Sequence, residues 1–188
     1  MALMETPDVS IGWKAQPFRL KGTDGKTHSL DDVKGRKGLL VMFICNHCPY
    51  VKAVIERLVH DAKELAEAGV GCVAIMSNDT ESYPDDSFDN MKTFAKRNGF
   101  TFPYLIDETQ EVARVYGAVC TPDFFGFNAK LELQYRGRLD ESWNLTVTDP
   151  QRELLEAMRE VADKGSTGAA QSPSMGCSIK WKSEKKRA

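Results

Sequence analysis

The sequence lacks the features of a membrane protein, a secreted protein or a nucleic-acid-binding protein. No apolar run approaches the roughly 18 residues of a membrane helix, and residues 1–8 show no basic region followed by an apolar run, so no signal peptide is predicted. A formal net charge of -2 gives no overall attraction to nucleic acid or anionic lipid. We therefore expect a cytoplasmic protein with no membrane or nucleic-acid partner.

Cysteine is scarce, and the number of cysteines is odd. The five cysteines are Cys45, Cys48, Cys72, Cys120 and Cys177. An odd set is unlike the paired framework of a small secreted protein, and cytoplasmic thiols are normally kept reduced. The cysteines are therefore expected to serve redox chemistry or metal binding rather than to cross-link the fold.

The length and composition predict one folded domain followed by a tail. A chain of 188 residues with 41% hydrophobic and 28% charged residues suits a single core. Residues 163–178 are rich in Gly, Ser, Ala and Pro, which is typical of a flexible linker. We therefore divide the chain into a domain at 1–162 and a flexible basic tail at 163–188 that contains Cys177.

Strands and helices alternate through the predicted domain, which indicates an α/β fold: a central mixed sheet with helices on both faces and an N-terminal hairpin. The predicted helices begin at residues that favour helix N-termini, namely Asp85 or Asp86, an Asp107–Gln110 capping box, and Asp149 followed by Pro150. The predicted strands are a hairpin over 18–30, buried strands at 39–44, 70–76 and 102–106, and an antiparallel hairpin at 124–128 and 131–136.

Cys45 and Cys48 lie at the junction between a buried strand and a helix. The apolar run 39–44 ends directly at Cys45, and from Val51 apolar residues recur with the helical period. A helix N-terminus stabilises a thiolate, and two intervening residues allow a reversible disulfide. His47, inside the pair, adds a partly cationic donor that stabilises the thiolate. The pattern predicts a redox-active Cys-x-x-Cys site; the alternatives are a chance pair or half of a zinc site.

The order of strand, Cys-x-x-Cys, helix, Thr-Pro, hairpin and helix resembles the thioredoxin superfamily over residues 10–162, and its redoxin branch in particular. Four motifs are similar to those of bacterial proteins grouped with alkyl hydroperoxide reductase and thiol-specific antioxidant (AhpC/TSA): Phe-Ile-Cys-Asn-His-Cys-Pro-Tyr-Val-Lys (43–52), Tyr-Pro-Asp-Asp-Ser (83–87), Cys-Thr-Pro-Asp (120–123) and Gly-Cys-Ser-Ile-Lys-Trp-Lys (176–182). The resemblance implies that Thr121-Pro122 is a cis-proline loop that faces the disulfide and binds substrate backbone. It also implies that Cys45 is the nucleophile and Cys48 the resolving thiol.

Two departures from the resembling families bear on activity. The peroxiredoxin pattern of Pro, Thr and a peroxidatic Cys in one loop is absent, since no Thr stands three residues before Cys45, and this disfavours peroxidase activity. Thioredoxin has a buried Asp six residues before its first Cys, where this chain has Leu39. Asp123, beside the proline loop, either replaces that proton acceptor or is a plain turn carboxylate.

The other three cysteines carry weaker signals. Cys72 lies within an apolar strand and is expected to be an inert core residue. Cys120 is close enough to Pro122 either for a redox or metal role or for simple packing. Cys177 either folds back to meet Cys45, Cys48 or Cys120, or is a stray exposed thiol. Three loop residues either border the site or only form the loop: Tyr83, Asp85 and Asp86.

The sequence thus predicts a thiol–disulfide oxidoreductase in redox homeostasis or antioxidant defence, acting on protein or small-molecule thiols and disulfides without a cofactor or resident metal. Cys45 attacks a disulfide sulfur, a mixed disulfide forms, and Cys48 releases it. One alternative is a thiol peroxidase in which Cys45 attacks a hydroperoxide. Another is a metal-binding module on Cys45, His47, Cys48 and Cys120 or Cys177. The oligomeric state is left open.

Overall fold

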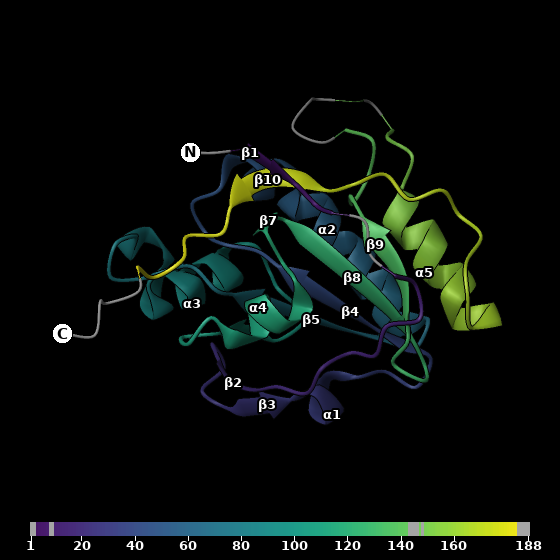
Figure 1. Ribbon diagram of the computed structural model, residues 1–188, viewed down its shortest axis with the longest axis horizontal. Helices are drawn as coiled ribbons and strands as arrows, with labels where there is room; N and C mark the ends of the chain where they lie inside the picture. The colour runs from purple at the N-terminus through teal and green to yellow at the C-terminus, as the bar shows by residue number, and fades with distance from the viewer. Residues whose placement is uncertain (1–2, 8–9, 143–146, 148, 184–188) are drawn as a thin grey trace.

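The computed structural model describes residues 3–7, 10–142, 147 and 149–183, which form a sandwich of helices around a mixed sheet (Figure 1). The main sheet has seven strands: β2 (Arg19–Gly22), β3 (Thr27–Ser29), β4 (Gly38–Phe43), β5 (Val70–Met76), β6 (Tyr104–Ile106), β8 (Asp123–Asn128) and β9 (Leu133–Gly137). Their order is β3-β2-β6-β5-β4-β8-β9. Strands β4, β5 and β6 are parallel, and the other pairings are antiparallel. The predicted α/β fold with a mixed sheet and an N-terminal hairpin is confirmed.

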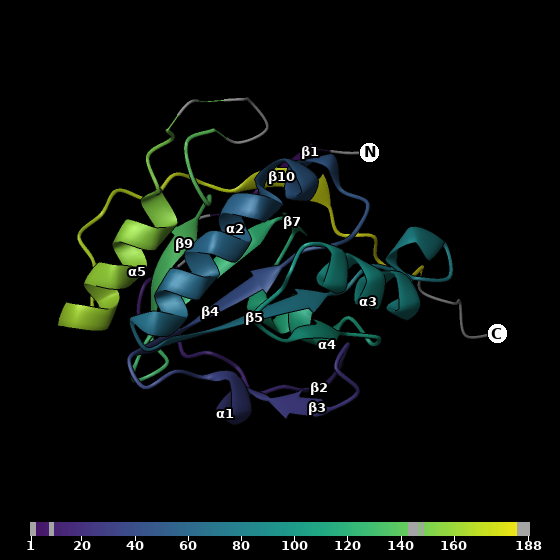
Figure 2. The same ribbon diagram turned by 180° about the vertical axis from the view of Figure 1, so that it is seen from behind.

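Helices cover both faces of this sheet, as Figures 1 and 2 show from opposite sides. They are α1 (Leu30–Val33), α2 (Pro49–Glu67), α3 (Phe88–Arg97), α4 (Glu111–Tyr116) and α5 (Glu153–Lys164). Helices α2, α3 and α5 contribute to one apolar cluster, and α1 and α4 to the other. None of the described helices is long and apolar enough to cross a membrane.

Strand β4 shows why the sheet forms with a core on each side. Leu40 and Met42 pack in the cluster below α2, whereas Leu39 and Val41 pack in the cluster of α4, and all four are fully buried. Successive side chains of a strand point to opposite faces, so a strand covered on both faces has a continuous apolar sequence. The 39–44 run therefore forms an interior strand of the sheet, between β5 and β8, and it ends just before Cys45.

Helix α3 begins later than the sequence predicted. Its N-cap is Ser87, whose side chain accepts a hydrogen bond from the Asn90 N–H. Asp85 and Asp86, the predicted caps, belong instead to the short 3₁₀ turn η1 (Pro84–Asp86). Because Asp86 does not cap α3, its carboxylate can contact the Cys-x-x-Cys segment.

Two other helix starts also differ from the prediction. The Asp107–Gln110 capping box does not form, because Gln110 adopts a left-handed backbone conformation (φ 64°) and the Asp107 carboxylate accepts from the Ala113 N–H. Helix α5 begins at Glu153 after Arg152 rather than at Asp149, whose φ is 53°. Helix α4 starts at Glu111, directly after the left-handed Gln110, and α5 starts after Arg152, so favourable capping side chains at Asp107 and Asp149 do not set the helix starts.

A second, three-stranded sheet lies at one end of the molecule and joins both ends of the chain. It consists of β1 (Leu3–Glu5), β10 (Met175–Ser178) and β7 (Cys120–Thr121) in the order β1-β10-β7, with both pairings antiparallel. Figure 1 shows β10 in yellow beside β1 in purple.

The segment predicted as a flexible tail therefore packs onto the domain over its described part. Helix α5 continues to Lys164, past the predicted boundary at 162, and β10 lies between two strands. Cys177 and Ile179 are both 3% exposed. Backbone pairing and this apolar burial outweigh the flexible composition of the linker. Residues 184–188 of the predicted tail lie outside the described residues.

Candidate active site

The Cys-x-x-Cys segment connects β4 to α2, as the sequence predicted, but the helix begins later than expected. Cys48, not Cys45, is the N-cap residue of α2, and Pro49 is the first helical residue. Cys45 is 1% exposed and Cys48 is fully buried. All five cysteines are free thiols. The helix N-terminus, which stabilises negative charge, is therefore beside Cys48.

The Thr-Pro loop faces both cysteines. The Thr121-Pro122 peptide bond is cis, in agreement with the resemblance described above. The Thr121 side-chain oxygen lies 3.4 Å from the Cys45 sulfur, and its carbonyl oxygen lies 3.2 Å from the Cys48 sulfur. One residue of the loop thus contacts both thiols, and a protonated Cys48 donates to its carbonyl.

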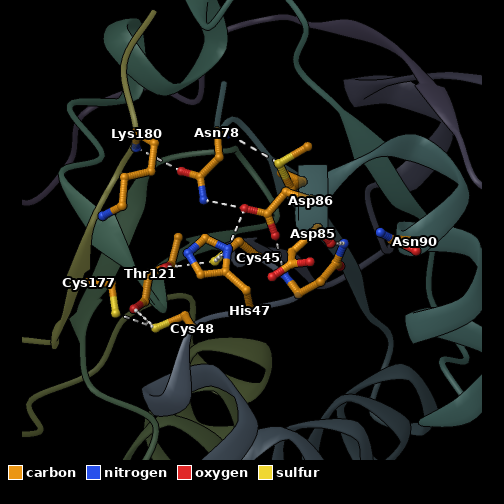
Figure 3. A network of polar contacts seen from close by, with 12 residues as sticks. Cys45, His47, Cys48, Asn78, Asp85, Asp86, Asn90, Thr121, Cys177 and Lys180 are labelled. Atoms are coloured by element: carbon orange, nitrogen blue, oxygen red, sulfur yellow. Dashed lines mark hydrogen bonds and ion pairs between the residues drawn. The ribbon is translucent and has the colours of Figure 1, made fainter. Parts of the chain in front are cut away.

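A third thiol completes the site. The Cys177 sulfur lies 3.0 Å from the Cys48 sulfur, on the strand that pairs with Thr121 (Figure 3). Of the alternatives that the sequence left open for Cys177, the structure shows the one in which the tail folds back. The thiol that it meets is Cys48, which therefore contacts both the Thr121 carbonyl and the Cys177 sulfur.

Hydrogen bonds stabilise the thiolate form of Cys48. Its pKa is lowered to about 5, because the Cys45 thiol donates to it and the Cys177 thiol and the Val51 N–H add to this effect, against the opposing effect of burial. The pKa of Cys45 is raised well above its usual value, because it donates to Cys48, is buried and faces the Asp86 carboxylate. Burial and donation to Cys48 raise the pKa of Cys177 to about 12.

Asp86 organises the other side of the site (Figure 3). This carboxylate is fully buried and accepts hydrogen bonds from the Asn46 backbone N–H (2.8 Å), the His47 Nδ1 (2.7 Å) and the Asn78 amide (2.8 Å). The same His47 nitrogen is 3.9 Å from the Cys45 sulfur. Asp86 therefore orients His47 toward Cys45.

The sequence alone does not identify Asp86 or Asn78 as site residues. Asp86 stands in a motif that the resemblance includes, but helix capping or loop formation explains an aspartate there equally well. Asn78 connects the site to the tail, because its side-chain oxygen accepts from the Lys180 N–H at 2.9 Å. Each of these contacts joins segments distant in sequence, so no local spacing predicts it.

The side chains of Asp123 and Cys120 contact groups other than the thiols of Cys45 and Cys48. Asp123 is fully buried and forms an ion pair with Arg136 at 3.0 Å, and burial raises its pKa to about 6. Its hydrogen bonds go to Arg136 and the Val119 N–H, so it is no plain turn carboxylate. Cys120 is fully buried and donates to the Pro122 carbonyl at 3.6 Å, and burial holds its pKa far above the usual range.

Two cysteines thus have packing environments rather than reactive ones. Cys72 resembles Cys120 in this respect, because burial raises its pKa to about 12. The thiols of Cys72 and Cys120 contact backbone carbonyls, whereas those of Cys48 and Cys177 contact each other.

Among the described residues, two sets of side chains have ligand atoms close enough to hold a metal ion, and one of the sets lies in this site. Ligand atoms of Cys45, His47 and Asp86 all lie within 4.8 Å of one another. Sulfur and imidazole ligands suit zinc or copper(I). In the structure these side chains form hydrogen bonds with one another and with Asn78. Their polar atoms therefore have partners of their own within the protein.

Comparison with known proteins identifies relatives of two kinds. The sequence model of the AhpC/TSA family matches residues 11–137. Thiol-disulfide oxidoreductase ResA of Geobacillus thermodenitrificans is 28% identical over 128 residues, and the match covers 64% of this chain and 65% of ResA. A Mycobacterium tuberculosis protein named "putative peroxiredoxin" is 24% identical over 145 residues, which cover 77% of this chain and 87% of the relative. The chain thus spans less than two thirds of the length of that ResA.

Several solved structures are also similar to this chain. A conserved protein from Geobacillus kaustophilus has a TM-score of 0.91 and 46% identity, with 97% of each chain covered. A protein from Sinorhizobium meliloti has a TM-score of 0.89 and 36% identity, covering 95% of this chain and 98% of its own. A secreted Mycobacterium tuberculosis disulfide oxidoreductase, 20% identical with a TM-score of 0.52 over 62% of this chain and 80% of its own, shares the fold. The fold is thioredoxin-like, as predicted.

Proposed function

The chain belongs to the AhpC/TSA family, and we propose that within it the protein is a thiol–disulfide oxidoreductase that works through a reversible Cys45–Cys48 disulfide. One observation carries the proposal: Thr121 contacts the sulfur atoms of both Cys45 and Cys48, and Cys48 lies at a helix N-terminus that stabilises negative charge on it. This is the environment in which a thiolate forms and a neighbouring thiol is ready to displace it. We place this exchange in cytoplasmic redox homeostasis and antioxidant defence.

Cys48 is proposed to perform the first step, the reverse of the order that the resemblance implied, and its position at the N-cap of α2 together with its lowered pKa supports this order. The Cys48 thiolate attacks one sulfur of a protein or small-molecule disulfide, whose S–S bond breaks as a mixed disulfide forms and the leaving thiolate takes up a proton. Cys45 then attacks the Cys48 sulfur. A Cys45–Cys48 disulfide results, and the substrate leaves as two thiols. The reverse sequence oxidises a dithiol.

The second step requires Cys45 to lose its proton, which passes to the substrate sulfur that leaves. The His47 Nδ1 lies beside the Cys45 sulfur and donates to Asp86. His47 is therefore proposed as the donor that faces Cys45 as negative charge develops on its sulfur, and Asp86 as the residue that positions the ring.

Trapping with a small disulfide tests the proposal and the order of the thiols. We expect the wild type to reduce the disulfide, the double variant Cys45→Ser/Cys177→Ser, which has no resolving thiol beside Cys48, to accumulate a mixed disulfide on Cys48, and Cys48→Ser to lose the reaction. Mass spectrometry of the intact protein measures each product, and Cys72→Ser is the control with a buried, unreactive thiol. Accumulation on Cys45 in Cys48→Ser alone would restore the order implied by the resemblance. No reaction in the wild type would refute the function.

Thiol peroxidase activity is a second candidate, supported by the burial of the thiols. With Cys45 1% exposed and Cys48 fully buried, a small hydroperoxide reaches them more easily than a folded protein does. In this case the Cys48 thiolate attacks the peroxide oxygen, releasing an alcohol or water, and Cys45 condenses with the sulfenic acid to form the disulfide and water. Stopped-flow consumption of peroxide by the reduced protein separates this candidate from disulfide exchange.

A further inference from the structure

Strand β10 occupies the edge of β7 in the manner of an added peptide. Cys177 pairs with Thr121, Ser178 pairs with Cys120, and the Ile179 N–H donates to the Val119 carbonyl at 3.0 Å. An extended segment that adds to a sheet edge gains affinity from the backbone pairing, and it places alternate side chains in fixed positions. The side chain that β10 places against the site is the Cys177 thiol.

Close approach of β10 depends on a glycine. A Cβ atom at Gly176 would overlap the carbonyl oxygen of Thr121, so a larger residue at this position requires the two strands to separate. Ser174 adds a further attachment, since its hydroxyl donates to the Pro122 carbonyl at 2.6 Å. These contacts fix the strand at the depth at which the Cys177 sulfur lies 3.0 Å from that of Cys48.

Hydrogen bonds on the far side of Cys177 hold the same segment in register. The Asp79 N–H and the Gln110 amide both donate to the Lys180 carbonyl, at 2.8 Å each. The Lys180 N–H donates to Asn78, which is bonded to Asp86 of the site. The tail is therefore attached both before and after Cys177, and the thiol is not carried by a free end.

We propose that Cys177 is a third exchange thiol, which β10 presents to Cys48 in the position of a substrate cysteine. The inference rests on the proposed function of the Cys45–Cys48 pair. In the oxidised protein, the Cys177 sulfur, on losing its proton, attacks Cys48. The Cys45–Cys48 bond breaks, a Cys48–Cys177 bond forms, and Cys45 leaves as a thiolate that takes up a proton. No electrons enter or leave, so the protein alternates between two disulfides.

The proposal identifies the chemistry of an external partner. A segment able to replace β10 must be extended, must carry a small residue where Gly176 lies over Thr121, and must carry a cysteine in the next position. Because β10 covers Cys48, the internal strand competes with such a peptide. Loosening β10 should therefore make Cys48 more accessible while lowering the yield of the internal disulfide.

Oxidation of the full-length Cys45→Ser variant tests the third thiol directly. The protein is oxidised with diamide, its free thiols are alkylated, and its peptides are mapped under non-reducing conditions. We expect an intramolecular Cys48–Cys177 disulfide in most molecules, and in the oxidised wild type a mixture of Cys45–Cys48 and Cys48–Cys177. Recovery of Cys177 as a free thiol in oxidised Cys45→Ser would overturn the proposal.

A matched pair of glycine variants separates the role of β10 from chance proximity. In the Cys45→Ser background, Gly176→Ala should slow Cys48–Cys177 formation at least about tenfold, because a displacement on the order of 1 Å misaligns the two sulfurs. Gly168→Ala, with open space around its Cβ, should leave the rate unchanged. Equal rates in the two variants would show that β10 does not position Cys177.

Failure of the Cys177 proposal can be distinguished from failure of the proposed function. If the wild type fails to reduce an external disulfide but oxidised Cys45→Ser forms the Cys48–Cys177 bond, the external activity is refuted and the internal contact stands. If the wild type reduces the external disulfide while Cys177 stays free, the reverse holds. Unfolding midpoints of all variants show whether a loss of disulfide reflects loss of fold.

Discussion

The two sheets of this molecule are stabilised by different interactions. The seven-stranded sheet is covered on both faces by apolar side chains, and its interior strand β4 is entirely buried. The three-stranded sheet is small: beside the buried Cys177 and the adjoining Ile179, it is attached by backbone pairing, by hydroxyl and amide hydrogen bonds and by the contact between two thiols. Apolar burial is the larger contribution to stability, whereas polar attachments contribute less and open locally. The comparison indicates that the seven-stranded sheet is rigid, and that the three-stranded sheet, which covers the thiols, can detach from it.

Truncation of a buried side chain in β4 should have the largest effect on stability. Leu40 is fully buried in the cluster below α2, so Leu40→Ala should lower the free energy of unfolding by about 2–5 kcal/mol. Guanidinium denaturation measures the change, and Val115→Ala, at a site that is 54% exposed, is the control expected to change it little. A loss below about 1 kcal/mol would contradict the view that the main sheet carries the stability.

The thiolate at the junction of the two sheets should make stability depend on pH. The folded pKa of Cys48, about 5, lies below the unfolded value of about 8.5, so between these values the unfolded state binds more protons. Its contribution is complete above about pH 8.5 and is lost as the pH falls through 5. Relative to Cys48→Ser, wild-type stability should rise by about 1.4 kcal/mol per pH unit within this window.

Denaturation of both proteins at several pH values, with thiolate absorbance near 240 nm in parallel, measures this dependence. Cys177→Ala should raise the midpoint of the absorbance titration, because Cys48 then loses a donor. Parallel stability curves for wild type and Cys48→Ser would show that Cys48 remains protonated in the folded protein.

Removal of one attachment of the small sheet should have the smallest effect, and a local one. Ser174→Ala deletes the hydroxyl that donates to the Pro122 carbonyl, which should cost about 1 kcal/mol. Hydrogen exchange should then be roughly fivefold faster at the Ile179 amide, with little change in β4. Ser166→Ala, at an exposed position, is the control. Equal acceleration in both sheets would show that they open together.

The difference between the sheets also explains how far the sequence predicts the structure. The predicted strand at 39–44, the helix after Cys48 and the 124–136 hairpin are confirmed, because each depends on the spacing of apolar side chains along one segment. Side chains that favour helix starts at Asp107 and Asp149 misled the prediction, because the backbone turns left-handed at Gln110 and Asp149.

The site is predictable only in part for a similar reason. Cys45, Cys48 and His47 are adjacent in sequence, so their pattern is visible without a structure. The carboxylate that contacts His47 belongs to Asp86, and the thiol that contacts Cys48 belongs to Cys177; neither pairing follows from local spacing. A composition rich in Gly, Ser and Pro predicts flexibility, but it contains no information about the open edge of β7 that receives β10.

The position of β10 near the end of the chain has a consequence for biosynthesis. The contact between Cys48 and Cys177 spans 129 positions of sequence, so a nascent chain leaving the ribosome presents its Cys-x-x-Cys motif long before the covering strand has been translated. During that interval Cys45 is the nearby partner available to Cys48. A protein oxidised while still being synthesised would therefore begin with the Cys45–Cys48 bond, and Cys177 would join the exchange only after translation has passed Ser178.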